Sequence, residues 1–186
     1  PQLAELLEPY VRGGDLAQIC RPVDWFGLNH YGPIFARADP NWLWGFAWGN
    51  APDDAPKSDI GWAIFPDAFR DELVELTQRF RLPVYVTENG AGGNDRPDRN
   101  GKVRDPKRVK YFEAYVAAMQ EAIGMGADVR GYFVWSLLDN FEWGSGYANR
   151  FGLVYVDYAT QQRVPKTSYG WYRDLIRGAR TRTRTA

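Results

Sequence analysis

Cysteine and histidine are nearly absent from this sequence of 186 residues. The single cysteine, Cys20, cannot form a disulfide within the chain, so we expect a reducing compartment and a cytoplasmic location. Zinc sites draw most of their ligands from these two residue types, and the chain offers only Cys20 and His30. We therefore expect no bound metal.

An excess of charge and a long apolar run are also missing. Lys and Arg number 23, as do Asp and Glu, so the net charge is zero, and binding to nucleic acid or to an anionic membrane is not expected. No apolar run approaches the roughly 20 residues of a membrane helix. The glycines after Glu88 lack the Lys-Ser/Thr of a phosphate loop and the spacing of a dinucleotide fingerprint, so we expect no cofactor.

Aromatic residues, in contrast, are abundant, with 8 Trp, 11 Tyr and 10 Phe in a chain that is 45% apolar. This composition is typical of a folded globular protein and excludes disorder for most of the length. The chain is long enough to close a single core. It begins with neither Met nor a signal-peptide pattern, so we interpret it as the middle of a longer protein.

Short apolar runs alternate with helical patterns along the chain. Residues 24–29, 84–87 and 131–136 predict strands that are buried on both faces. Helices are predicted from an N-cap at Asp67 to Phe80, from Asp105-Pro106 to about Gly124, and over 168–176. This alternation predicts an α/β fold with a parallel sheet.

Long irregular loops follow the predicted strands, over 32–66, 91–104 and 140–150. A small hairpin is predicted from 153–156 and 163–164. The last ten residues, 177–186, carry four arginines and predict a solvated, disordered tail, which leaves 1–176 as the folded part.

Polar side chains gather where the predicted strands end, which is the edge where sites form in α/β folds. Glu88 directly follows Val84-Tyr85-Val86-Thr87, and residue patterns alone favour catalysis or binding and a structural rim role equally. For Glu142 and Asp139, residue patterns alone favour an ordinary loop charge over a functional role. Carboxylates beside indole rings suit a carbohydrate, whose C–H faces stack on Trp and whose hydroxyls need acceptors. Trp135, Glu142 and Trp143 fit that pattern, although Trp135 also reads as core packing.

At these positions the sequence resembles the family 1 glycoside hydrolases, the β-glucosidase and β-galactosidase group. Residues 84–90, which contain Thr-Glu-Asn-Gly, resemble the nucleophile motif at the end of the seventh strand. Residues 131–147 (GYFVWSLLDNFEWGSGY) and 150–158 (RFGLVYVDY) resemble the eighth strand and its sugar-binding loop, and 25–31 resemble the sixth strand with its Asn-x-Tyr pair. The resemblance implies the C-terminal portion, about strands six to eight with their helices, of a (β/α)8 TIM barrel.

The resemblance also implies roles for individual residues in a retaining mechanism. It makes Glu88 the nucleophile and Tyr31 the phenol that orients it. Asn29 is then the residue near the sugar 2-hydroxyl and the acid/base. The substrate-binding set that it implies is Trp135 as the platform under the sugar, Glu142 for the 4- and 6-hydroxyls, Trp143 for the 3-hydroxyl, and Phe151 as a wall.

Two parts of that pattern are missing here. The family's acid/base glutamate lies in an Asn-Glu-Pro motif, which does not occur in this sequence, and the Gln and His from the early strands are also absent. A complete barrel needs about 250 residues. We therefore expect an N-terminal portion or fragment, carrying Asn-Glu-Pro, to complete both the fold and the site, and we expect the chain by itself to be an open piece of barrel with unpaired edge strands.

Three functions remain open at this point. The first is a retaining β-glycosidase, most simply a β-glucosidase acting on small β-glucosides and cello-oligosaccharides, and inactive as the isolated chain. The second is a non-catalytic carbohydrate-binding fragment of such an enzyme. The third, a phospho-β-glycosidase, is disfavoured because Glu142 would repel a sugar 6-phosphate.

Overall fold

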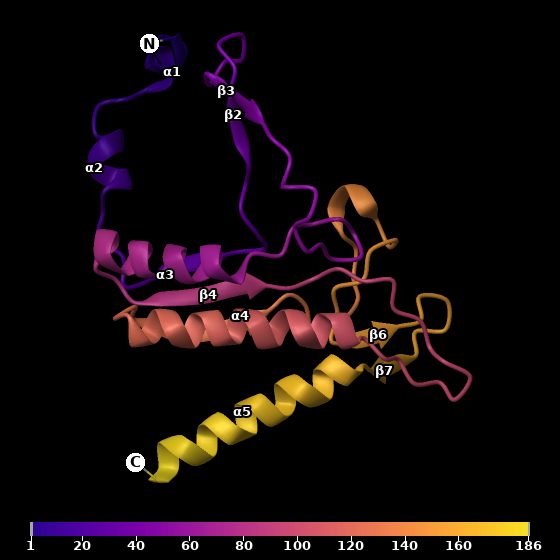
Figure 1. The fold of residues 1–186 in the computed structure, drawn as a ribbon. Coiled ribbons are helices and arrows are strands. Elements are labelled where there is room, and N and C mark those ends of the chain that lie inside the picture. The colour runs from indigo at the N-terminus through magenta and orange to yellow at the C-terminus, as the bar shows by residue number, and fades with distance from the viewer. Residues whose placement is uncertain (1, 186) are drawn as a thin grey trace.

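The computed structural model describes residues 2–185 and is built on a three-stranded parallel sheet (Figure 1). The strands are β1 (Phe26–Asn29), β4 (Val84–Asn89) and β5 (Val129–Val134), in the order β1-β4-β5. Helix α3 (Pro66–Phe80) connects the first two strands and α4 (Pro106–Gly124) connects the last two. The predicted alternation and parallel sheet are confirmed.

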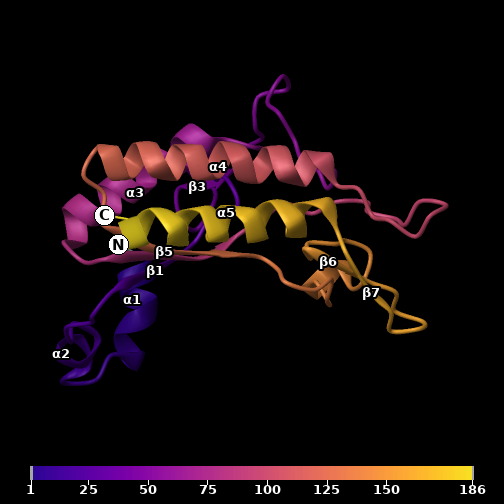
Figure 2. The same cartoon turned by 90° about the horizontal axis from the view of Figure 1, so that it is seen from below.

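The core lies between one face of this sheet and the helices. The predicted apolar face of α3 places Phe69 and Leu73 in full burial, and α4 contributes Phe112 and Tyr115. Leu28, Val84 and Val86 meet them from the sheet. Figure 2 shows α3 and α4 on one side of the strands, with α1 (Gln2–Leu7) and α2 (Asp15–Ile19) on the other. Among the residues that the structure describes, no helix combines the length and apolar character needed to cross a bilayer.

The starts of the two connecting helices differ from the prediction. Helix α3 begins at Pro66 with Phe65 as its N-cap, so Asp67 lies inside the first turn and its carboxylate pairs with Arg70 instead. The predicted N-cap at Asp67 was wrong by two positions, because proline suits the first helical position and moves the start ahead of the aspartate. Asp105 does occupy the N-cap position of α4, but its carboxylate bonds Arg108 and the backbone of Ser168 rather than the helix end.

The long loop at 32–66 contains structure that the sequence did not predict. Strands β2 (Ala36–Ala38) and β3 (Phe46–Trp48) form an antiparallel hairpin there, which projects away from the main sheet (Figure 1). Two short 3-10 helices, η1 (Glu8–Tyr10) and η2 (Trp143–Ser145), were also not predicted. The predicted second hairpin is confirmed as β6 (Val154–Val156) and β7 (Arg163–Pro165).

The last helix, α5 (Thr167–Thr185), is longer than predicted. It starts close to the expected position but continues beyond Ile176, so the predicted disordered tail is helical as far as Thr185, and Ala186 lies outside the described residues. Helix α5 packs on α4, where Trp171 stacks on Phe112 with ring centroids 6.0 Å apart.

The sheet is open at both edges. Within the described residues, β1 and β5 each pair only with β4, as expected for a piece of barrel. Trp25 beside β1 and Phe133 on β5 are about half exposed, and Trp25 meets only the ring of Tyr85 among the described aromatic rings. Unpaired strand edges leave backbone N–H and C=O groups without sheet partners, and the exposed rings add apolar surface beside them.

Candidate active site at the sheet edge

The register of β1 and β4 brings the predicted catalytic residues together. Asn29 pairs with Glu88 across the two strands, and the backbone N–H of His30 donates to the carbonyl of Glu88 at 2.9 Å. Two residues after Asn29, the Tyr31 hydroxyl donates to Glu88 Oε2 at 2.6 Å, a short bond of the charge-assisted kind. The two strand ends therefore present one carboxylate with a phenol fixed on it.

The surroundings of Tyr31 keep its phenol protonated. Burial, the hydrogen bond to Glu88 and the charges of Glu88 and Glu142 all raise the pKa of Tyr31 far above its ordinary value. A phenol that stays protonated remains a hydrogen-bond donor, and its partner Glu88 is the acceptor. The arrangement therefore keeps the Tyr31 hydroxyl as a donor to Glu88 Oε2.

Asn29 is exposed at the same edge and is held by a neighbour on β4. The Thr87 hydroxyl donates to Asn29 Oδ1 at 2.6 Å. This bond occupies the amide oxygen, so the side-chain NH₂ of Asn29 is the group that can donate to a ligand.

Trp135 and Glu142 form a second pair at the end of β5. The indole Nε1 donates to Glu142 Oε1 at 3.0 Å, and the backbone N–H of Trp135 donates to the carbonyl of Asn89 at 2.9 Å. A Cβ at Gly90 would lie 2.0 Å from the Trp135 carbonyl oxygen, so only glycine allows this close approach. Burial and the charges of Glu88 and Asp139 raise the pKa of Glu142, and the bond from Trp135 partly opposes that rise.

Phe151 lies behind Tyr31 rather than on the open surface. Its ring is 2% exposed and contacts Tyr31 and Trp62 at centroid distances of 6.1 and 5.6 Å. Trp62 also packs edge-on against Tyr31 at 5.5 Å. The expected sugar wall is therefore, in this structure, a buried support for Tyr31. Sequence reasoning did not single out Trp62, because it lies in a loop without periodicity.

Trp143 is not brought together with the other predicted residues. It begins η2, has a left-handed φ of 41° and is 87% exposed. Across the described residues, no hydrogen bond or ring contact joins its side chain to Glu88, Trp135 or Glu142.

Asn89, which belongs to the Thr-Glu-Asn-Gly motif, is a site residue to which sequence reasoning gave no role. Its fully buried amide donates to the His30 carbonyl at 2.8 Å and to the Tyr111 hydroxyl at 3.0 Å, and it accepts from Tyr132 at 2.6 Å. These bonds join β1, α4 and β5 at the position next to Glu88. The signal was present, because an amide directly after a buried apolar strand must find hydrogen-bond partners.

A groove opens beside Asn29 and Tyr31. Its volume is about 530 Å³ and its walls include Phe35, Trp48 and Trp62 from the 32–66 loop. Across the described part of the chain, no group of His, Cys, Asp and Glu side chains is arranged to hold a metal ion. The site therefore combines a hydrogen-bonded carboxylate, a second carboxylate on an indole, and an aromatic groove.

Known proteins share this arrangement of sequence and fold. Residues 3–181 match the sequence model of Glycosyl hydrolase family 1. The chain is 40% identical over 171 residues to "Beta-glucosidase A" of Thermotoga maritima. This match covers 88% of this chain and 36% of that protein. It is also 40% identical over 191 residues to "Bifunctional beta-D-glucosidase/beta-D-fucosidase" of Bifidobacterium breve, over 90% of this chain and 40% of that one.

A solved structure gives the same result for the fold. The β-glucosidase from Thermotoga maritima in complex with glucoimidazole superposes with a TM-score of 0.84 at 37% identity, over 95% of this chain and 40% of that one. The chain thus spans about two fifths of the length of these relatives. The predicted fold class, a C-terminal portion of a (β/α)8 barrel, is confirmed. The chain belongs to glycosyl hydrolase family 1.

Proposed function

We propose that this chain supplies the nucleophile part of a retaining β-glycosidase, with Glu88 as the nucleophile. The observation that carries the proposal is the 2.6 Å bond from the Tyr31 hydroxyl to Glu88 Oε2 at the ends of two adjacent parallel strands. A retaining site needs one carboxylate that is ionised and oriented before the substrate arrives. Covalent trapping of Glu88 by a 2-deoxy-2-fluoro glucoside tests the proposal.

The chemistry takes two displacements. In the first, a Glu88 oxygen bonds to the anomeric carbon while the glycosidic C–O bond breaks, and the leaving oxygen takes a proton from a general acid. In the second, a water molecule loses a proton to the same group and attacks the anomeric carbon, which breaks the ester to Glu88. Tyr31 holds Glu88 in place through both steps.

The acid/base lies outside this sequence in the proposal. No Asn-Glu-Pro motif occurs here, and the chain spans about two fifths of its relatives. We infer that an N-terminal portion carrying strands one to five and Asn-Glu-Pro pairs with the open edges of β1 and β5. We call the chain together with that portion the assembled enzyme.

The proposed substrates are small β-glucosides and cello-oligosaccharides. Trp135 serves as the platform under the sugar and Glu142 accepts from the 4- and 6-hydroxyls, a pairing supported by the 3.0 Å bond between these two side chains. Trp143 reaches the 3-hydroxyl once substrate is bound. Relatives named "Beta-glucosidase A" and "1,4-beta-D-glucan glucohydrolase" support the glucoside assignment.

A non-catalytic carbohydrate-binding fragment is the second candidate, favoured by the missing acid/base. It predicts sugar binding without turnover, even when the N-terminal portion is present. The glycosidase proposal predicts turnover in that complex, so a single activity assay separates the two.

Replacement of Tyr31 by Phe tests the orienting phenol. The variant loses one hydrogen bond to a charged group, a change of about 1.5–3 kcal/mol, so kcat in the assembled enzyme should fall by about tenfold or more while the fold is kept. Steady-state kinetics with an aryl β-glucoside measures the effect. Tyr172→Phe is the matched control, because that hydroxyl donates to the Tyr132 carbonyl and not to Glu88. An unchanged kcat in Tyr31→Phe would exclude the proposed role.

A further inference from the structure

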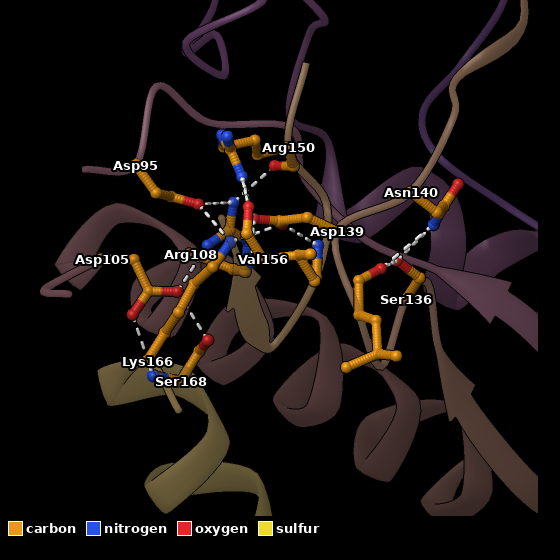
Figure 3. Close-up of polar contacts among 12 residues, drawn as sticks. Asp95, Asp105, Arg108, Ser136, Asp139, Asn140, Arg150, Val156, Lys166 and Ser168 are labelled. Carbon is orange, nitrogen blue, oxygen red and sulfur yellow. Dashed lines mark hydrogen bonds and ion pairs between the residues drawn. The ribbon is translucent and has the colours of Figure 1, made fainter. Parts of the chain in front are cut away.

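The structure also contains an ion-pair network that the proposed function does not yet use (Figure 3). We define this network as three carboxylates and three cations, which are Asp95, Asp105, Asp139, Arg108, Arg150 and Lys166. All except Arg150 are buried. Lys166 Nζ lies 2.6 Å from Asp95 Oδ2 and 2.8 Å from Asp139 Oδ1, and Arg108 lies 2.6 Å from Asp95 Oδ2.

Asp139 lies near the start of a loop and bonds the backbone that follows the end of that loop. We call residues 136–151, which connect β5 to the β6 hairpin, the sugar loop. The Asp139 side chain, which has no exposed surface, accepts from the backbone N–H of Gly152 at 3.0 Å and of Val156 at 3.3 Å. It also accepts from Lys166 at 2.8 Å and from Arg150 at 2.7 Å. Asp139 lies near the start of the sugar loop, and its carboxylate therefore holds the backbone that follows the end of the loop.

Backbone hydrogen bonds join the two ends of the sugar loop, which carries the proposed substrate-binding residue Glu142. Ser136 N donates to the Phe151 carbonyl at 3.2 Å, and Leu153 N donates to the Ser136 carbonyl at 2.8 Å. A Cβ at Gly152 would lie 2.2 Å from Asp139 N, so the two ends of the loop lie in direct contact. Glu142, three residues after Asp139, lies on this loop and reaches back to the Trp135 indole.

The network also ties the sugar loop to the segment that follows the nucleophile strand. The Arg150 carbonyl accepts from Gly93 N at 2.9 Å and from Arg108 at 2.7 Å, while the Arg108 Nε donates to the Ala91 carbonyl at 3.0 Å. The Arg150 guanidinium lies over the Tyr155 ring at 4.2 Å. The position of the loop is thereby fixed relative to Glu88, which precedes Ala91 by three residues.

Charge balance makes Asp139 the sensitive member of the network. Burial and the neighbouring Arg108 lower the pKa of Lys166, and the charges of Asp95 and Asp139 oppose that shift. Loss of the Asp139 charge leaves Lys166 with Asp95 alone, which Arg108 already shares. A buried cation without its full set of partners moves or deprotonates, and the backbone N–H groups of Gly152 and Val156, just after the sugar loop, lose their charged acceptor.

We propose that Asp139, held by Lys166 and Arg150, is a positioning residue that fixes the sugar loop so that Glu142, bonded to Trp135, meets the 4- and 6-hydroxyls of the substrate. This inference rests on the proposed glycosidase function. The inference differs from a role in stability alone, because it requires that the loss of activity on replacing Asp139 depends on the presence of Glu142.

A double-mutant cycle in the assembled enzyme tests that requirement. Asp139→Asn should lower kcat/KM for an aryl β-glucoside by on the order of tenfold, and the same change in a Glu142→Ala background should cost less than about threefold. The loss should also shrink for the corresponding aryl 6-deoxy-β-glucoside, which has no 6-hydroxyl for Glu142 to bind. Asp128→Asn, which breaks an exposed pair with Arg130 at the other end of β5, should change neither value.

Equal losses in both backgrounds and with both substrates would overturn the inference and leave a structural role only. If Asp139→Asn does not fold, Arg150→Lys replaces it, because this change keeps the charge but shortens the reach to Asp139 and to the Val156 carbonyl. Arg150→Lys should lower kcat/KM by a smaller factor, and this loss should also shrink in the Glu142→Ala background. An assembled wild type that does not turn over the glucoside would overturn the proposed function as well. Normal wild-type turnover with equal losses would overturn only the role of Asp139.

Discussion

Glu88→Gly should abolish hydrolysis of an aryl β-glucoside by the assembled enzyme, with a fall in kcat on the order of 10⁴-fold or more. The variant removes the atom that bonds to the anomeric carbon, and the structure offers no second carboxylate on Tyr31 among the described residues. Steady-state kinetics measures the loss. Glu75→Gln removes an exposed carboxylate of α3 that pairs with Arg79, and it should leave kcat unchanged.

The same Glu88→Gly variant should still transfer a sugar. Given an α-glucosyl fluoride, which resembles the missing intermediate in its anomeric configuration, and an acceptor sugar, it should form a β-glycosidic bond with release of fluoride. The retained acid/base activates the acceptor hydroxyl, and without Glu88 the product is not hydrolysed. Hydrolysis at the wild-type rate by Glu88→Gly would remove this residue from the chemistry.

The isolated chain should show no glycosidase activity. It holds the proposed nucleophile but no Asn-Glu-Pro motif, and among the described residues β1 and β5 pair only with β4. General acid catalysis typically contributes about 10²–10⁴-fold, and an unactivated alkyl glucoside depends on it fully because its alkoxide is a poor leaving group. The measurement is hydrolysis of an alkyl and an aryl β-glucoside by the purified chain.

Addition of a fragment that carries strands one to five and Asn-Glu-Pro should restore turnover. In that complex the acid/base carboxyl should lie about 5–5.5 Å from Glu88, the spacing of a retaining pair. The same fragment with Gln in place of the motif glutamate is the control and should not restore turnover of the alkyl glucoside. Robust hydrolysis of that substrate by the lone chain would mean that a residue of this sequence serves as the acid.

Local patterns predicted the elements that pack on the central sheet. The apolar residues of β4 and the spacing of Phe69 and Leu73 on α3 are direct consequences of burial, so they are visible in the sequence. The prediction that β1 and β5 are buried on both faces was wrong, because each strand lies at an open edge of the sheet and keeps exposed residues. The hairpin of β2 and β3 was missed because its strands have three residues each and no buried alternation. The tail was misread because charge was weighed above helix continuity from Thr167.

The site was predictable where residues lie at strand ends and unpredictable where distant residues meet. Tyr31 and Glu88 end adjacent strands, so a parallel sheet brings them together. Asp139 was also read as an ordinary loop charge, which was wrong, because it is buried with Lys166 and Arg150. No spacing rule relates 95, 105, 139 and 166, since only the folded chain places these residues side by side.

Identification of the residue that becomes covalently bound to the sugar tests the central claim most directly. The assembled enzyme is incubated with an activated 2-deoxy-2-fluoro-β-glucoside, whose fluorine slows the second displacement so that the glycosyl-enzyme ester accumulates. Peptide mapping by mass spectrometry should place one label on the peptide that contains Thr87-Glu88-Asn89, and fragmentation should assign it to Glu88. A label on any other residue, or inactivation without a covalent label, would contradict the account.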